Sequence, residues 1–218
     1  MVSELLGAHS AYSYARKKIL DGTCIAGARL TTKDLPLKIG KRRAALRQLE
    51  ADGLVVLKPH GGALVRPLDP QEFKDLCGAR QALEVYAAGL AAENRNEAQV
   101  EDLRRPLLAI RRILDGMRDP TFDEDLLNDL VRADIKFHLQ IVEIAGNSWL
   151  KREVMRLRVL HRVIATALKS KPIHTLDEHR RVQSCHEEIF EAIVHGDCAA
   201  AKEAMERHLQ GNPLRFRR

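Results

Sequence analysis

The chain has 218 residues, of which 45% are hydrophobic, 30% are charged and 4% are aromatic. These proportions exclude a largely disordered chain, and the small aromatic share is more typical of a helical protein than of a β-sandwich or barrel. The sequence contains no run of about twenty apolar residues and no basic-then-apolar secretory leader, so we expect a cytoplasmic protein that does not engage a membrane.

Positive charge is concentrated in the first third of the chain. Residues 1–68 contain 12 Lys and Arg against 5 Asp and Glu, whereas residues 69–218 contain 24 against 25. This distribution is typical of a protein in which only the N-terminal domain meets a polyanion. The length also suffices for two compact domains, and we place the boundary between residues 68 and 69.

The N-terminal third predicts three helices followed by a β-hairpin. Asp21-Gly22 and Gly53 are helix terminators, Pro36 interrupts the second helix, and Gly61-Gly62 supplies the hairpin tip. Helices in this order before a hairpin make a winged helix-turn-helix. We expect the helices over residues 10–20, 33–39 and 41–52, and the strands over residues 54–57 and 63–65.

Basic residues on the third helix and at the hairpin tip are the candidate contacts to DNA. Arginine suits guanine and phosphate because of its forked geometry, and glycines let a wing approach the sugar-phosphate chain closely. A basic helix is often only a solvated surface, but the order of the elements and the localised charge favour DNA binding. The candidates are Lys41, Arg42, Arg43 and Arg47 on the helix and Lys58, His60, Gly61 and Gly62 in the wing.

The rest of the chain has helical periodicity after a short joint at residues 67–70. Gly, Pro and Asn at residues 119–120, 146–147, 171–172 and 196–197 favour helix ends there. Helices with such short connections predict an antiparallel all-helical bundle, so the protein is expected to be mainly α. We expect the helices over residues 72–93, 98–117, 123–145, 148–170, 175–195 and 197–210.

Histidines in the predicted bundle offer a candidate metal site. Asp134 and His138 are four residues apart on one helix, so both emerge on the same face, and His186 and His208 lie on two later helices. Three imidazoles and a carboxylate suit Zn²⁺, Ni²⁺ or Mn²⁺ better than Ca²⁺. Nine histidines also produce chance pairs, so a solvated Asp–His pair is the alternative.

Two segments carry a resemblance to a known family. The segment RRAALRQLEADGLVVLKPHGGALV, residues 42–65, resembles the end of the winged-helix domain of GntR-family regulators. Residues 79–92, ARQALEVYAAGLAA, resemble the opening helix of the FCD ligand-binding domain found in the FadR-like subfamily. The resemblance implies a dimeric transcriptional regulator, expected to be a repressor, that binds a double-stranded DNA operator.

The same resemblance assigns roles to residues of the helical domain. FCD domains that bind metal carry an Asp-x-x-x-His pair and two later histidines, which here are Asp134, His138, His186 and His208. A small, organic-acid effector is then expected to alter DNA binding. Arg80 matches a position that reaches the effector cavity, with an ion pair to Glu84 as the alternative; Asn147 shapes a helix end or touches the ligand.

The sequence departs from the family at the start of the recognition helix. Family members begin this helix with a Ser-Arg-Thr-Pro type segment, whereas Ile39-Gly40-Lys41 is shorter and lacks the Ser/Thr cap. A ligand-binding protein with a vestigial DNA-binding head is therefore one alternative. A metalloenzyme is another, but His186-Glu187 is followed by Phe190 where a zincin motif needs His, so we expect no enzyme activity.

Overall fold

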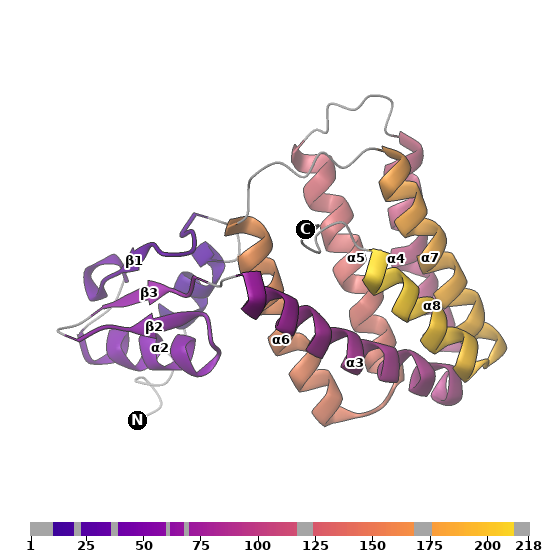
Figure 1. Ribbon diagram of the computed structural model, residues 1–218, viewed down its shortest axis with the longest axis horizontal. Coiled ribbons are helices and arrows are strands. Elements are labelled where there is room, and N and C mark those ends of the chain that lie inside the picture. The colour runs from indigo at the N-terminus through magenta and orange to yellow at the C-terminus, as the bar shows by residue number, and fades with distance from the viewer. Residues whose placement is uncertain are drawn as a thin grey trace. The chain divides into compact units, whose positions relative to one another are not determined.

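The computed structural model describes residues 11–19, 23–35, 39–59, 62–67, 70–116, 124–167 and 176–211 (Figure 1). The chain divides into two compact units. One comprises Met1–Leu76 with Arg156–Lys171, and the other comprises Cys77–Met155 with Pro172–Arg218. Among the described helices, none combines the length and apolar character that a membrane crossing requires.

The first unit contains the predicted winged helix-turn-helix. Residues 11–19 are helical, and α2 (Ile39–Ala51) and the hairpin strands β2 (Val55–Leu57) and β3 (Ala63–Val65) lie within two residues of their predicted bounds. A further strand, β1 (Arg29–Leu30), pairs with β3, so the antiparallel sheet has the order β1-β3-β2. The second predicted helix is represented by a 3-10 turn, Thr32–Asp34, and residues 36–38 lie outside the described part.

Buried side chains fix α2 against the hairpin. Leu46 and Leu49 of α2 are at most 3% exposed, and they pack with Leu54 and Val55. Gly53 ends α2 with a φ of 76°, and the backbone N–H of Leu54 then donates to the Leu49 carbonyl at 2.9 Å. The glycine terminator therefore turns the chain directly from α2 into β2.

A polar contact holds the first helix to the end of α2. The Tyr12 hydroxyl donates to the Asp52 carboxylate at 2.6 Å. Burial and this acceptor together raise the pKa of Tyr12 to about 12, which keeps the phenol protonated and able to donate. The hydrogen bond joins residues 40 positions apart, so it secures the first helix to α2 within the unit.

The residues that the structure describes after the joint form six helices, whose bounds follow the predicted breaks. α4 packs against α5 and α7, and α7 packs against α8 (Figure 1). In α4 the buried residues Leu103, Leu107, Ile110 and Leu114 recur at helical spacing. The helices are α3 (Pro70–Asn94), α4 (Glu97–Gly116), α5 (Glu124–Ile144), α6 (Ser148–Ala167), α7 (Leu176–His195) and α8 (Cys198–Gly211).

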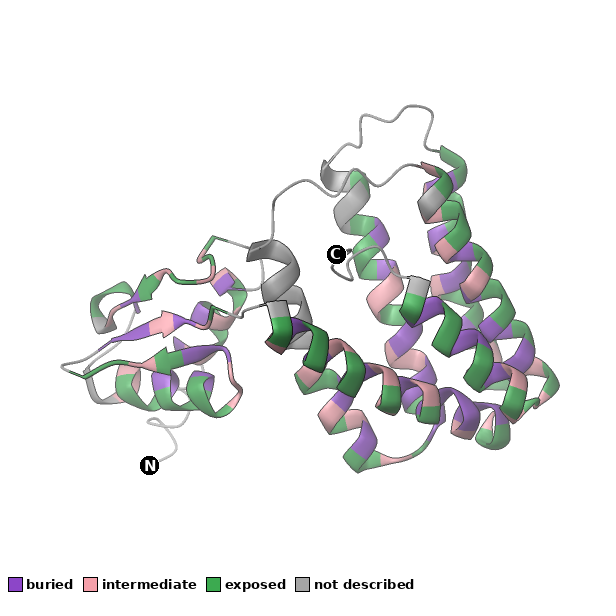
Figure 2. Ribbon diagram, in the orientation of Figure 1, coloured by how far each residue is buried: buried purple, intermediate pink, exposed green. Residues whose placement is uncertain are grey.

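The interior of the bundle is apolar except along one stretch. Figure 2 shows buried residues alternating with exposed ones along α4, α7 and α8, as expected for helices with one inward face. Phe137, Ile141 and Ile193 are fully buried in this core. Six polar residues of the described chain are also buried, and all six lie on α3, α5, α7 and α8: Arg80, Glu84, His138, Gln183, His186 and His208.

Replacing Leu49 tests the dependence of the first unit on this packing. We expect Leu49→Ala to lower the free energy of unfolding by about 2–5 kcal/mol, because it removes buried methyl groups and leaves a cavity beneath α2. Gln48→Ala, at an exposed position of the same helix, should change it by less than about 0.5 kcal/mol. Urea denaturation followed by circular dichroism measures both; equal effects would contradict the assigned core.

Candidate functional site

Four side chains from three helices meet inside the bundle. Asp134 and His138 lie four residues apart on α5, His186 lies on α7 and His208 lies on α8. Each offers one ligand atom, and these four atoms all lie within 4.8 Å of one another. The structure therefore brings together all four residues that the sequence singled out as metal ligands.

The closest approaches within this cluster join ring nitrogens and a carboxylate oxygen. Nε2 of His138 lies 2.9 Å from Nε2 of His208, and Nε2 of His186 lies 3.2 Å from Oδ1 of Asp134. Nε2 of His138 is 3.6 Å from the same oxygen. The imidazoles are at most 2% exposed, whereas the Asp134 side chain is 34% exposed, so Asp134 is the one residue of the cluster that solvent reaches appreciably.

The surroundings favour ionised Asp134 and neutral His208. Burial by itself would raise the pKa of Asp134, but the imidazoles of His138 and His186 hold that pKa well below its usual value. Burial and the two neighbouring imidazoles hold the pKa of His208 well below its usual value. A carboxylate and a neutral imidazole are the protonation states in which these groups bind a metal ion.

The donor set fits a divalent transition metal. Two ring nitrogens 2.9 Å apart both point into the cluster, and Nδ1 of His208 is buried without a hydrogen-bond partner. Crowding of nitrogen lone pairs is unfavourable unless a proton or a cation lies between them. Imidazole and carboxylate donors in this number are typical ligands of Zn²⁺, Ni²⁺ or Mn²⁺.

Two buried residues of α3 extend the cluster outward. Oε1 of Glu84 accepts a hydrogen bond from Nε of Arg80 at 2.8 Å, and Oε2 of Glu84 lies 2.8 Å from Nδ1 of His138. The ion pair of Arg80 with Glu84 was one of the two sequence interpretations of Arg80. The contact of Glu84 with His138 was missed, although a charged pair at i and i+4 on an otherwise apolar helix face was the available signal.

Asn147 lies at the start of α6 and caps that helix. Its Oδ1 accepts from the backbone N–H groups of Trp149 and Leu150 at 3.1 and 3.0 Å. This geometry is the helix-end role that the sequence suggested. The same position follows Gly146, whose φ of 70° terminates α5.

The candidate DNA contacts differ in exposure. Arg43, Arg47 and Lys58 are exposed, whereas Lys41 and Arg42 are half-buried. Gly62 is buried with a φ of 86°, and a Cβ there would lie 3.0 Å from the Leu30 carbonyl oxygen, so this glycine is required by the β1–β3 pairing. His60 and Gly61 lie outside the described residues.

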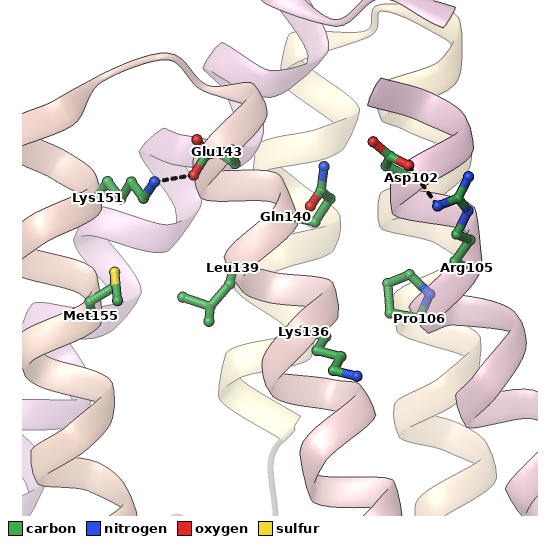
Figure 3. Close-up of a pocket in the computed structure, with 9 residues that line it drawn as sticks. All are labelled: Asp102, Arg105, Pro106, Lys136, Leu139, Gln140, Glu143, Lys151 and Met155. Atoms are coloured by element: carbon green, nitrogen blue, oxygen red, sulfur yellow. Dashed lines mark ion pairs between the residues drawn. The ribbon is translucent and has the colours of Figure 1, made fainter. Parts of the chain in front are cut away.

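A surface hollow of about 490 Å³ lies on α4, α5 and α6, apart from the cluster (Figure 3). Its charged residues are largely paired with each other: Glu143 with Lys151, and Asp102 with Arg105 at 3.2 Å. None of its lining residues is buried, and none belongs to the Asp–His cluster. The buried cluster is therefore the stronger candidate for the functional site.

The chain is similar to proteins of one regulator family. Residues 75–211 match the family model of the FCD domain. The "HTH-type transcriptional regulator LutR" of Bacillus subtilis is 28% identical over 185 residues, covering 77% of this chain and 79% of the relative. The "HTH-type transcriptional repressor GlaR" of Escherichia coli is 27% identical over 184 residues, covering 83% and 80%.

Solved structures share the fold of the whole chain. Escherichia coli McbR/YncC has a TM-score of 0.75 at 18% identity and covers 94% of both chains. A "putative transcriptional regulator GntR" from Rhodococcus sp. RHA1 has a TM-score of 0.70 at 20% identity, covering 94% of this chain and 95% of that one. At these identities the likeness is one of fold, and it includes both the winged head and the helical bundle.

Removing Arg80 tests the importance of the buried ion pair for stability. Arg80→Ala leaves the Glu84 carboxylate buried without its cation, so we expect a loss of about 3–5 kcal/mol in the free energy of unfolding. Arg132→Ala breaks an exposed pair with Asp129 on α5 and should cost under about 1 kcal/mol. Chemical denaturation of both variants measures the difference, and similar losses would argue against a buried pair.

Proposed function

The chain belongs to the FCD-domain family of GntR-type transcriptional regulators, and we propose that it is a repressor whose DNA binding is controlled by a metal-dependent organic-acid effector. The observation that carries the effector half of this proposal is the Asp134–His138–His186–His208 cluster, in which three imidazoles are buried and the Asp134 side chain is partly exposed. Residues 1–68 form the DNA-binding domain, and residues 69–218 form the effector-binding and dimerisation domain.

Exposed arginines of α2 support the assignment of the first domain. α2 occupies the position of the recognition helix in a winged helix-turn-helix, and it exposes Arg43 and Arg47. Lys58 is exposed between β2 and the wing tip, where it can reach a phosphate. Two such heads in a homodimer read two half-sites, which increases affinity through paired contacts.

The ligands of the metal are Asp134, His138, His186 and His208, and Zn²⁺, Ni²⁺ or Mn²⁺ suits them. When bound, such an ion supplies positive charge and open coordination positions for the oxygens of an anionic ligand. The three imidazoles are closed off from solvent, so the effector approaches from the side on which Asp134 is exposed.

Arg80 provides the second anchor for an organic acid. It is 6% exposed, and its Nε donates a hydrogen bond to Glu84. A guanidinium carries further N–H groups on its terminal nitrogens, which can bind a carboxylate in a bidentate fashion. Asn147 is the weaker candidate for effector contact, because its side-chain oxygen already accepts two backbone N–H groups.

Specific DNA binding is the first test of the repressor. We expect the purified chain to bind the duplex upstream of its own gene at least about a hundredfold more tightly than a scrambled duplex at physiological salt. Fluorescence anisotropy measures both affinities. Equal, salt-sensitive binding to both duplexes would mean that the head contacts only phosphates, and would leave the metal-containing domain as the functional part.

Two arginine variants test which residues carry the affinity. Arg43→Ala and Arg47→Ala should each weaken binding to the specific duplex by about 1–3 kcal/mol if they reach base edges. Arg132→Ala, which removes an exposed arginine of α5, should leave the affinity unchanged. Parent-like affinity in both α2 variants would contradict α2 as the recognition helix.

Metal content tests the second domain independently of DNA. The parent chain should purify with stoichiometric divalent metal, measured by inductively coupled plasma mass spectrometry, and His208→Ala should lose it because a buried ligand is removed. His195→Ala is the matched control, since that imidazole is exposed at the end of α7. Unchanged metal in His208→Ala would exclude the site.

A further inference from the structure

Glu84 is a carboxylate buried between two partners that use its two oxygens separately. It is 1% exposed on α3. Oε1 accepts from Arg80 and Oε2 faces Nδ1 of His138, each at 2.8 Å. A residue that served only to neutralise Arg80 would not need its second oxygen at hydrogen-bond distance from a ring nitrogen on another helix.

The contact at Oε2 determines which nitrogen of His138 carries the proton. A carboxylate oxygen accepts hydrogen bonds and does not donate them, so an Nδ1 that lies 2.8 Å from Oε2 is the nitrogen of a neutral His138 ring on which a proton is stabilised. The neutral ring then has its lone pair on Nε2, the atom that lies 2.9 Å from Nε2 of His208 and 3.6 Å from the Asp134 carboxylate. Glu84 therefore turns the donor nitrogen of His138 toward the centre of the cluster.

Arg80 in turn fixes Glu84. Its Nε–H holds Oε1 along the axis of the same helix, at i and i+4, which leaves Oε2 directed at His138. The three side chains form a continuous series from Arg80 through Glu84 to His138. Carboxylates that accept from the second nitrogen of a metal-bound histidine orient the ring and increase its basicity.

We infer that Glu84 is a positioning residue of the metal site, one that sets the tautomer and ring orientation of His138, and that Arg80 secures it in this role. This inference rests on the proposed function, because it assigns Glu84 a contribution to metal affinity. It also adds a fourth helix to the site, since the ligands lie on α5, α7 and α8 and Glu84 lies on α3.

A pair of double variants separates positioning from charge neutralisation. Arg80→Met with Glu84→Leu removes both charges and the acceptor for His138, whereas Arg80→Met with Glu84→Gln removes both charges and keeps an amide oxygen that can accept from Nδ1–H. Affinity for Zn²⁺ alone is measured on the full chain by competition with a chelating dye. Circular dichroism and thermal unfolding of the metal-free proteins establish that each variant is folded.

We expect the Met/Leu variant to bind Zn²⁺ about 10–100-fold more weakly than the parent and the Met/Gln variant to recover most of that loss. Glu93→Leu, which removes an exposed carboxylate from the same helix, should bind like the parent. Nitrogen NMR of the metal-free chain should find His138 protonated at Nδ1 in the parent and in Met/Gln, and not fixed in Met/Leu.

Two outcomes would overturn the inference in different ways. Equal, parent-like Zn²⁺ affinity in both double variants would show that Glu84 merely neutralises Arg80, and would leave the metal site itself intact. A parent chain that takes up no Zn²⁺ would contradict the proposed function. It would also contradict the role of Glu84 in metal binding, because that role requires a metal site.

Discussion

The burial of charge beside the Asp–His cluster is the constraint on which the second unit depends. A carboxylate or guanidinium removed from water costs several kcal/mol unless a partner of opposite charge meets it with good geometry. Arg80 and Glu84 are both nearly inaccessible, and the remaining oxygen of Glu84 lies 2.8 Å from Nδ1 of His138 on α5. The helices must therefore be held in one register along their axes, because a shift of one turn would leave these groups unpaired.

Apolar residues of the core also contact the cluster directly. Phe137 directly precedes His138 and Phe190 follows His186 by four residues; both are buried, and the ring of Phe137 packs edge-on against His186 at a centroid distance of 4.9 Å. Such packing fixes the imidazole without competing for its nitrogens. The Phe137 ring therefore helps to orient His186, and Glu84 is the polar residue that contacts His138.

Most of the architecture could be predicted from local signals. Glycines such as Gly53, Gly146 and Gly196 ended helices where they were expected to, because a positive φ suits glycine best. The strand β1 was missed, since two residues are too few for an alternating pattern and its pairing with β3 is a tertiary contact. Local sequence cannot reveal a partner that folding brings from far along the chain.

In the candidate site, too, local sequence predicted the features within one helix but not the contacts between helices. The Asp134–His138 spacing was visible as one helix face, but joining it to His186 and His208 required a family resemblance, because no periodicity relates residues on separate helices. Glu84 lies 54 positions before His138, and only the fold brings them together. Gly62 was assigned to DNA from its place in the wing, whereas its burial against Leu30 gives it a structural role that the pattern could not distinguish.

The helix that carries Glu84 extends well beyond its contact with His138. Pro70 begins this helix soon after β3 ends, and Glu84 lies about four turns further on, so about 20 Å of helix separates them. A helix of this kind behaves as a stiff rod over such a distance. If the helix tilted by about 5° about Glu84, its Pro70 end would move by about 2 Å. The helix that the chain enters after β3 is thus the same helix that carries the buried partner of His138.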